Sequence, residues 1–364
     1  MTAAADPCAA APSRLAVLTP WLVPASLAGR KAANLGDGFI LRAIERLLGP
    51  FAGSRTGSPR AAPTAAEFAA LEKAPCVVLA GANQLRDDFS VWPGLTAERL
   101  RASRLRLLPF AIGLHGDPRC TGRLSAGTRE LLLALHERIE CSSWRCPRTV
   151  DWLRRELPQL APQLVMTGCP VVYDRPLLDG APFATGERRV AVTVTERGDF
   201  WARETAVLDF AARRFPRAQR SVVLHQNWSP PTRLELLRHR FWPAPAQRLD
   251  DYQRLRQYAV RRGFQVVCPR DADEGRAFYE SVDLHVGSRL HAHLLCLSRA
   301  RRSWLVRVDG RADGIAEALD FPLCRAEAVE VDLEGALAFD FDRVRERARK
   351  DFTAMQRFVE TLPR

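Results

Sequence analysis

Hydrophobic residues along the first half of the chain form short apolar runs that alternate with segments of helical spacing. Five runs are typical of buried strands, at 14–18, 76–80, 105–113, 139–143 and 164–167. Apolar positions recur at helical spacing between them, at 38–48, 128–138 and 147–157. Strands that alternate with helices in this way predict βαβ units and a largely parallel sheet.

The same alternation restarts in the second half. Strands are expected at 189–195, 221–225, 264–268, 282–286 and 304–308, and helices at 201–214, 232–240, 251–262 and 290–297. Periodicity is lost only over 176–187, where Pro176, Gly180, Pro182 and Gly186 indicate a linker.

These patterns predict an α/β protein with two Rossmann-like domains that face each other across a cleft. The N-terminal domain is expected over 14–175 and the C-terminal domain over 188–332, with strand ends and their loops lining the cleft. A helical segment at 333–364 is expected to pack back across the domains. Residues 1–13 are expected to form a flexible leader, because they lack the basic and apolar regions of a secretory signal.

Composition narrows the class of protein. The apolar share of 47% is that of an ordinary globular protein. No apolar run approaches the about 20 residues that cross a bilayer. Nine cysteines, an odd number scattered through apolar segments, indicate reduced thiols and a cytoplasmic location. Cys141 and Cys146 have no second pair at zinc-binding spacing, so no metal is expected.

The net charge of +12 comes almost wholly from arginine. A basic balance favours anionic partners, such as phosphorylated substrates or the anionic face of a membrane. The arginines are spread along the chain, however, and no nucleic-acid-binding motif is present. Nucleic acid is therefore not an expected partner. Trp92, Trp144 and Trp228 have two interpretations, as core residues or as contacts to an anionic membrane surface.

The strongest candidate for chemistry is the segment from Gly287 to His293, at the junction of a buried strand and a helix. Arg289 and His291 fall near the first turn of that helix, where free backbone N–H groups and the helix dipole favour an anion. An equally simple interpretation pairs Arg289 with a structural carboxylate and makes His291 a core histidine. Of the neighbouring His285 and His293, at least one is expected to pack structurally.

Further polar motifs follow other predicted strands or open other helices. Asn34-Leu35-Gly36-Asp37 precedes a helix, and Asn83 follows the strand at 76–80. Arg145 lies between a strand and a helix, and Gly168-Cys169-Pro170 closes the first domain. Helix capping and turn formation also explain the two asparagines.

Taken together and in this order, these motifs resemble those of the polysaccharide pyruvyl transferase family. The family shares an N-terminal Asn-x-Gly-Asp segment, a central Arg-Asp-x-x-Ser type segment, a Gly-Asp-Pro segment and a C-terminal Ser-x-Arg-Leu-His-Ala motif. Here these stand as Asn34 to Asp37, as Arg145 with Thr149, as Gly168 to Pro170, and as Ser288 to Ala292. The resemblance runs from about residue 33 to 322, and the last motif is the specific one.

The resemblance implies a fold like that of GT-B glycosyltransferases and an enzyme that transfers pyruvate from phosphoenolpyruvate to a sugar as a ketal. It assigns Arg289, Leu290 and His291 to the donor and gives His291 a catalytic role. It places Arg311 where the family usually has lysine. The residues expected to bind substrate are Asn34, Gly36, Asn83, Arg145, Ser288, Arg289, Leu290, His291 and Arg311.

The chemistry of this reaction explains why such residues would be needed. Phosphoenolpyruvate carries a carboxylate and a phosphate, so its site requires fixed cations, which Arg145, Arg289 and Arg311 would supply. Histidine titrates near neutral pH, so His291 is the candidate general acid or base. Asp37 is the candidate for activating an acceptor hydroxyl. No metal or organic cofactor is required.

Three departures from the family pattern leave alternatives open. Arg311 keeps the charge of lysine but cannot donate its proton, Cys146 stands where the family tends to have aspartate, and Cys169 replaces the aspartate of Gly-Asp-Pro. The alternatives are a GT-B-like glycosyltransferase that uses a nucleotide sugar, and a non-catalytic glycan-binding or assembly protein of the same fold. The expected partners are phosphoenolpyruvate and a sugar or lipid-linked glycan, with a location in the cytoplasm or at the cytoplasmic face of the membrane.

Overall fold

The computed structural model describes residues 15–24, 34–49, 55–115, 122–196, 198–225 and 243–363, without the side chains of 55–56 and 243–250. Its N-terminal part contains a parallel sheet with strand order β2-β1-β3-β4. A parallel pair, β5 and β6, continues beside it through a bridge between Ile112 and Trp144. These strands are β1 (Ala16–Leu18), β2 (Arg55–Gly57), β3 (Val77–Ala80), β4 (Leu107–Phe110), β5 (Ser142–Trp144) and β6 (Leu164–Met166).

The C-terminal part contains a second parallel sheet with strand order β12-β11-β10-β7-β8-β9. Its strands are β7 (Arg189–Thr193), β8 (Gln219–Val223), β9 (Gln265–Val267), β10 (Leu284–Gly287), β11 (Arg302–Val306) and β12 (Leu323–Cys324). Strand β10, which leads into the candidate motif, is buried along its whole length between β7 and β11. A central parallel strand of this kind directs its carboxyl end toward the site.

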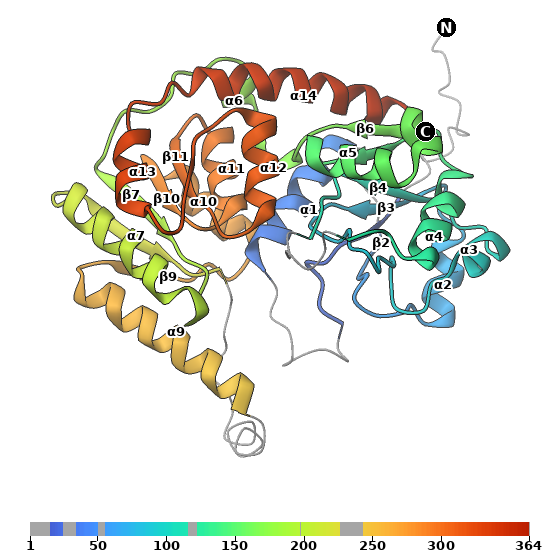
Figure 1. The fold of residues 1–364 in the computed structure, drawn as a ribbon, viewed down its shortest axis with the longest axis horizontal. Helices are drawn as coiled ribbons and strands as arrows, with labels where there is room; N and C mark the ends of the chain where they lie inside the picture. Colours follow the sequence, from blue (N-terminus) through green and yellow to red (C-terminus); the bar gives the residue numbers. More distant parts are fainter. Residues whose placement is uncertain are drawn as a thin grey trace, which may run out of the picture.

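Helices cover both sheets, as Figure 1 shows. Those of the N-terminal part are α1 (Leu35–Leu48), α2 (Ala65–Leu71), α3 (Ala97–Ala102), α4 (Ala126–His136) and α5 (Pro147–Glu156). The short helix α6 (Arg175–Leu178) lies in the connection between the sheets. The C-terminal part adds α7 (Trp201–Arg214), α9 (Pro243–Arg261), α10 (Ala272–Glu280), α11 (Leu290–Ser298), α12 (Gly310–Leu319), α13 (Val329–Ala336) and α14 (Asp342–Glu360).

The architecture is the predicted one, with two Rossmann-like domains that face a cleft. The two domains meet along helix α1, which packs on α10 of the C-terminal domain. Gly275 of α10 permits this contact, because a Cβ there would lie 2.9 Å from the Leu35 side chain and 3.0 Å from that of Phe39. The first turn of α1 is thereby fixed beside the C-terminal domain.

Apolar periodicity did not predict several elements, because they are short or polar. Helix α10 has the sequence ADEGRAFYE, and its clearest signal is the cap at Asp271, whose side chain accepts from the backbone of Asp273 and Glu274. Helix α12 likewise begins at a capping aspartate, Asp309. Strand β2 and helices α2 and α3 were also not predicted. The helix predicted at 232–240 and the leader at 1–13 lie outside the described residues.

The C-terminal segment does pack back across the domains. It forms two helices instead of one, and α14 runs along both domains in Figure 1. Near its end, Phe358 packs edge-to-face on Phe110 of β4, with ring centroids 5.3 Å apart. Trp92 and Trp144 are buried, so the core interpretation is correct for them, whereas Trp228 lies outside the described residues. No helix among the described residues could span a membrane.

The turn at Gly287 generates the first prediction. Its φ of 150° is unfavourable for L side chains, and a Cβ would lie 2.2 Å from the backbone oxygen of Thr193 on the neighbouring strand. Gly287→Ala should therefore lower the free energy of unfolding, measured by urea denaturation, by about 3 kcal/mol.

The matched control is Gly335→Ala in α13, where a Cβ meets nothing within 4 Å. That substitution should raise the free energy of unfolding by about 0.5–1 kcal/mol. Wild-type stability in Gly287→Ala would show that the close approach of β10 to β7 is not required.

Candidate functional site

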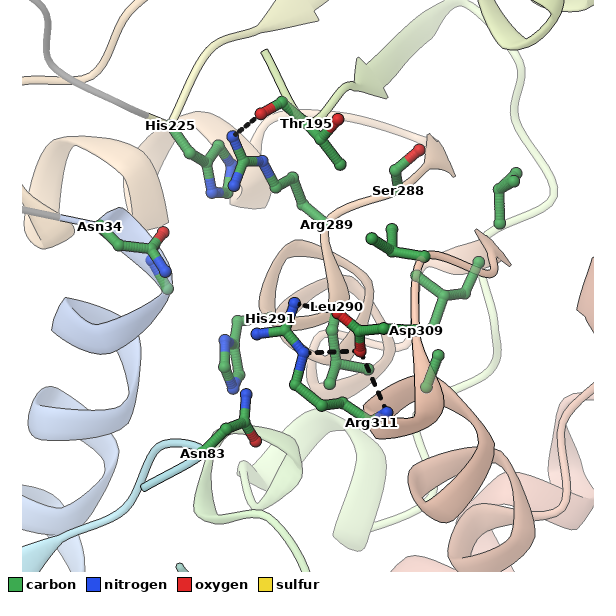
Figure 2. A pocket seen from close by; sticks show the side chains of 15 residues that line it. Asn34, Asn83, Thr195, His225, Ser288, Arg289, Leu290, His291, Asp309 and Arg311 are labelled. Atoms are coloured by element: carbon green, nitrogen blue, oxygen red, sulfur yellow. Dashed lines mark hydrogen bonds and ion pairs between the residues drawn. The ribbon is translucent and has the colours of Figure 1, made fainter. Parts of the chain in front are cut away.

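A cleft that is partly open to solvent lies where the two domains meet (Figure 2). The N-terminal domain contributes the start of α1 and the loop after β3. The C-terminal domain contributes the carboxyl ends of β7, β8, β10 and β11 with the starts of α11 and α12. The lining residues are Asn34, Gly36, Asn83, Thr195, His225, Ser288, Arg289, Leu290, His291, Leu305, Val306, Val308, Asp309, Arg311 and Ala312.

The start of α1 places the N-terminal motif against His291. Asn34 is the helix cap, and its side chain accepts from the backbone N–H of Gly36 at 3.3 Å. A Cβ on Gly36 would lie only 2.7 Å from Nδ1 of His291. Glycine at position 36 is therefore required for the two domains to approach each other. The capping interpretation of Asn34 is correct, and its side chain also lines the cleft.

His291 lies in the first turn of α11 and is 8% exposed. Its Nε2 has no hydrogen-bond partner among the described residues. Burial lowers the pKa of His291 well below its ordinary value, and the nearby positive charges of Arg145 and Arg311 lower it further. The sequence predicted a histidine that titrates near neutrality without a large perturbation, whereas the lowered pKa makes His291 a neutral imidazole.

Asp37, one turn into α1, has the opposite perturbation. Burial raises its pKa from 3.8 to about 6, although the positive charges of Arg60, Arg311 and Arg145 act to lower it. The Asp37 carboxylate lies 3.5 Å from the Arg60 guanidinium, and its side chain is 13% exposed. Asp37 thus changes its charge near pH 6. It is not among the residues that line the cleft, although it directly follows Gly36, which is.

Arg145 lies at the junction of β5 and α5, behind the surface of the cleft. It is 1% exposed, and its Nη2 donates to Oδ1 of Asn83, which does line the cleft. Its Nε and Nη1 have no partner among the described residues. Burial without a carboxylate partner lowers the pKa of the guanidinium, and a cation in this state favours an incoming anion.

Arg311 enters the cleft from the first turn of α12. Its guanidinium makes a two-pronged contact with Asp309, through Nε to Oδ1 at 2.7 Å and through Nη2 to Oδ2 at 2.6 Å. Asp309 also caps the helix by accepting from the backbone N–H of Arg311. The Asp309 carboxylate therefore balances the charge of Arg311 locally.

Arg289 does not join this cluster. Its Nη2 pairs with the Glu196 carboxylate at 3.0 Å, and its Nε donates to the carbonyl of Val194 at 2.7 Å. The interpretation that paired Arg289 with a structural carboxylate is thus the one the structure shows, although Arg289 also lines the cleft. Ser288 lines the cleft too, and its hydroxyl donates to Glu204. Both His285 and His293 are core residues that share the hydroxyl of Ser303.

Of the polar residues that line the C-terminal side of the cleft, sequence reasoning missed Thr195, His225 and Asp309, and it also missed the supporting residue Glu196. His225 follows β8, Thr195 follows β7, and Glu196 is a buried carboxylate with φ of 59°. Burial and the charge of Arg289 lower the pKa of His225, and its Nε2 meets the Tyr279 hydroxyl at 2.6 Å. The signal was available, because polar residues at the carboxyl ends of neighbouring parallel strands converge on one edge.

No family model matches the chain, and no curated protein matches it. Among solved structures, UDP-GlcNAc 2-epimerase from Neisseria meningitidis is 10% identical with a TM-score of 0.51, over 96% of this chain and 98% of that one. The UDP-GlcNAc 2-epimerase from Methanocaldococcus jannaschii is 10% identical with a TM-score of 0.52, over 95% and 99%. A putative UDP-N-acetylglucosamine 2-epimerase from Listeria monocytogenes is also 10% identical, with a TM-score of 0.51 over 96% and 95%. At this identity the likeness concerns the fold, which these chains share over almost their whole length.

The raised pKa of Asp37 generates the second prediction. Because the folded state holds this proton more tightly, the carboxyl contributes stability that is complete at low pH and lost as pH rises through about 6. Asn has no such proton, so the stability of Asp37→Asn relative to wild type should increase by about 1 kcal/mol between pH 5 and pH 7.5. Urea denaturation at the two pH values measures this change.

Asp332→Asn is the control, because Arg325 lowers the pKa of Asp332 to about 2 and its carboxylate stays ionised throughout this window. Its stability difference from wild type should not change with pH. A flat difference for Asp37→Asn as well would contradict the assignment of a buried, protonatable carboxyl.

Proposed function

We propose that the protein is a pyruvyl transferase that moves the enolpyruvyl group of phosphoenolpyruvate onto a sugar to form a ketal. The observation that carries this proposal is the group of unpaired nitrogens beside the cleft. Nε and Nη1 of Arg145 and Nε2 of His291 are buried and have no partner among the described residues. Buried polar groups are ordinarily satisfied, so such a cluster favours a ligand rich in acceptor oxygens.

On binding, the donor would replace the present hydrogen-bond partners of two arginines, Arg145 and Arg311. Displacement of the Asn83 side chain would open Arg145 to one anionic group, and release from Asp309 would free Arg311 for the other. Phosphoenolpyruvate has the required pair of groups, a carboxylate and a phosphate, and guanidinium binds both in a two-pronged manner. Arg289, held by Glu196, would contact the ligand only through its remaining nitrogen.

His291 and Asp37 would divide the proton transfers. One sugar hydroxyl bonds to C2 while the methylene gains a proton, the bond between C2 and the phosphate oxygen breaks, and the second hydroxyl bonds to C2. Of the two hydroxyl protons, one ends on the new methyl group and the other on phosphate. The negative charge of the donor raises the pKa of His291 and enables it to supply a proton, while ionised Asp37 accepts one from a hydroxyl.

The departures from the family pattern fall where the domains pack. The thiol of Cys146 faces Gly314, where a Cβ would lie 2.6 Å from Sγ, and burial raises the pKa of Cys169. Both side chains are buried. Buried thiols in a packed interface are consistent with tolerated variation at these positions and with activity that does not need the two carboxylates.

The second candidate is a GT-B-like enzyme that uses a nucleotide sugar. It is favoured by the fold, because the similar structures are epimerases of UDP-GlcNAc and none of the three reported above is a pyruvyl transferase. A third alternative is a glycan-binding or assembly protein without catalysis. It is consistent with the pairing of Arg311 to Asp309, because a paired cation is not available to an anionic donor. Ligand-induced stabilisation separates the two enzymes, since phosphoenolpyruvate raises the melting temperature in the first case and a UDP-sugar in the second.

The proposed chemistry gives the third prediction. Incubation with phosphoenolpyruvate and a panel of free and lipid-linked sugars should release phosphate and add one pyruvate ketal to the acceptor, as measured by mass spectrometry. His291→Asn should reduce kcat by about a hundredfold or more, because the proton carrier is lost. Arg311→Met should raise KM for phosphoenolpyruvate, because one anionic group loses its cation.

Arg325→Met is the control, since Arg325 forms a comparable two-pronged pair with Asp332 outside the cleft. It should leave both constants unchanged. Near wild-type ketal formation by His291→Asn would contradict the catalytic assignment, and turnover of a UDP-sugar without phosphate release would favour the second candidate.

A further inference from the structure

A second buried carboxylate, in addition to that of Glu196, lies beneath the C-terminal wall of the cleft. Glu204, in the first turn of α7, is 1% exposed. Its Oε1 accepts from the Thr195 hydroxyl at 2.8 Å, and its Oε2 accepts from the Ser288 hydroxyl at 3.1 Å. One side chain thereby ties the segment that follows β7 to the segment that follows β10.

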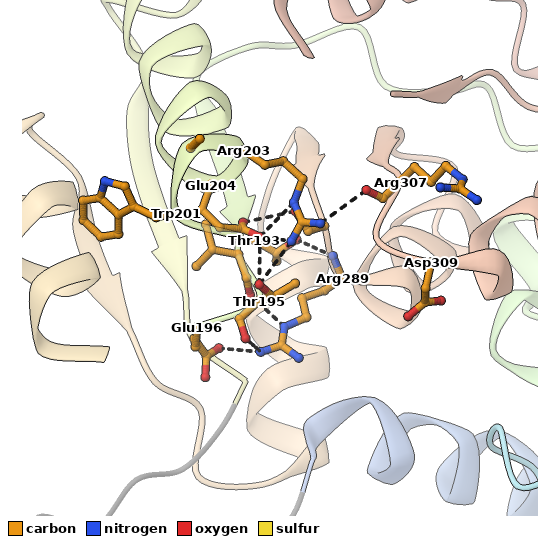
Figure 3. Close-up of polar contacts among 12 residues, drawn as sticks. Thr193, Thr195, Glu196, Trp201, Arg203, Glu204, Arg289, Arg307 and Asp309 are labelled. Atoms are coloured by element: carbon orange, nitrogen blue, oxygen red, sulfur yellow. Dashed lines mark hydrogen bonds and ion pairs between the residues drawn. The ribbon is translucent and has the colours of Figure 1, made fainter. Parts of the chain in front are cut away.

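Arg203 extends these contacts to a third segment, as Figure 3 shows. Its Nε donates to Glu204 at 3.1 Å, its Nη2 to the Thr195 hydroxyl at 3.2 Å, and its Nη1 to the carbonyl of Arg307 at 3.4 Å. Arg307 follows β11 and leads to Asp309 and Arg311. The Glu204 network, defined as Thr195, Arg203, Glu204, Ser288 and the Arg307 carbonyl, therefore joins all three segments.

This network differs in kind from the cluster around His291. No side-chain atom of the Glu204 network is among the buried polar atoms without a partner in the described part of the chain. It therefore offers no unpartnered buried atom to a ligand, although Thr195 and Ser288 also line the cleft. A buried ion pair is seldom more stabilising than apolar residues of the same size, and one recognised use of such a pair is to fix a specific arrangement.

The position of Ser288 shows which arrangement is fixed. Ser288 directly precedes the turn that contains Arg289 and His291, and its backbone N–H donates to the carbonyl of Thr193 at 3.0 Å. Ser288 is thus held twice: its backbone N–H is bonded to β7, and its hydroxyl is bonded to Glu204 of α7. Loss of either contact would allow the start of α11, and with it the imidazole of His291, to shift.

We propose that Glu204 is a positioning residue, which acts through Ser288 and Thr195 to set the position of His291 relative to the cations of the cleft. The consequence for catalysis rests on the proposed function, whereas the effect on His291 does not. Glu204→Gln preserves the size of the side chain but removes the charge that two hydroxyls and Arg203 share. Displacement of about 1 Å at such a site costs up to about a hundredfold in rate.

The test uses the full chain labelled with ¹⁵N-histidine, in which His291→Asn identifies the ring resonances of His291. Glu204→Gln and Ser288→Ala should each shift these resonances and weaken the binding of inorganic phosphate, measured by calorimetry, about tenfold. The double variant should be no worse than Glu204→Gln alone, because the two residues act in series.

Glu156→Gln is the matched control, since Glu156 also pairs with an arginine, Arg129, but far from the cleft in the N-terminal domain. It should lower the melting temperature without changing the His291 resonances or the affinity for phosphate. If Glu204→Gln does not fold, Thr195→Val and Thr195→Ser form a milder pair, of which only the valine should displace His291.

Unchanged His291 resonances and phosphate affinity in Glu204→Gln, with a loss of stability like that of Glu156→Gln, would overturn the proposal. The proposed function fails separately, if the wild-type protein binds neither inorganic phosphate nor phosphoenolpyruvate. In that case the resonances of His291 still decide whether Glu204 sets its position.

Discussion

Positive charge is held away from water where the two domains meet, and the rest of the site depends on it. Arg145 is almost fully buried, has only an amide oxygen to accept from its guanidinium, and keeps two nitrogens without partners in the described part of the protein. Burial lowers the pKa of His291, and the fields of Arg145 and Arg311 lower it further. A protein that retains such a charge bears a cost in stability, and an anionic ligand would relieve it.

The scaffold contains two polar arrangements with different roles. The Glu204 network is closed, because carboxylate, guanidinium and hydroxyls satisfy one another beneath the loops. The cluster around His291 is open, because nitrogens of Arg145 and His291 have no partner among the described residues and Arg311 is held by its own helix cap, Asp309. A rigid support under an incompletely satisfied site is the combination that preorganisation requires. Close backbone packing at Gly36 and Gly287 places the open cluster on this support.

Apolar periodicity predicted the fold because the central parallel strands are buried on both faces. Strand β10 and helix α11 lie where the pattern indicated. The polar motifs, and not the apolar pattern, pointed to Asn34, Asn83, His291 and Arg311, which all line one cleft. Apolar periodicity did not predict short polar helices such as α10 and α12, because each buries few residues and its clearest sequence signal is one capping aspartate. Charge pairing was also beyond it. Glu196 comes 93 residues before Arg289, and only the parallel alignment of β7 with β10 brings the two together.

The central claim is that a neutral His291 lies beside Arg311 and beside Arg145, two of whose nitrogens have no partner among the described residues, at a site for an anionic donor. Calorimetric titration with phosphoenolpyruvate at pH 7.5, repeated in buffers of different ionisation enthalpy, measures affinity and proton exchange together. Binding should be accompanied by proton uptake that is lost in His291→Asn, because the bound anion raises the pKa of the imidazole. Absence of binding, or binding with the same proton exchange in both proteins, would contradict the account.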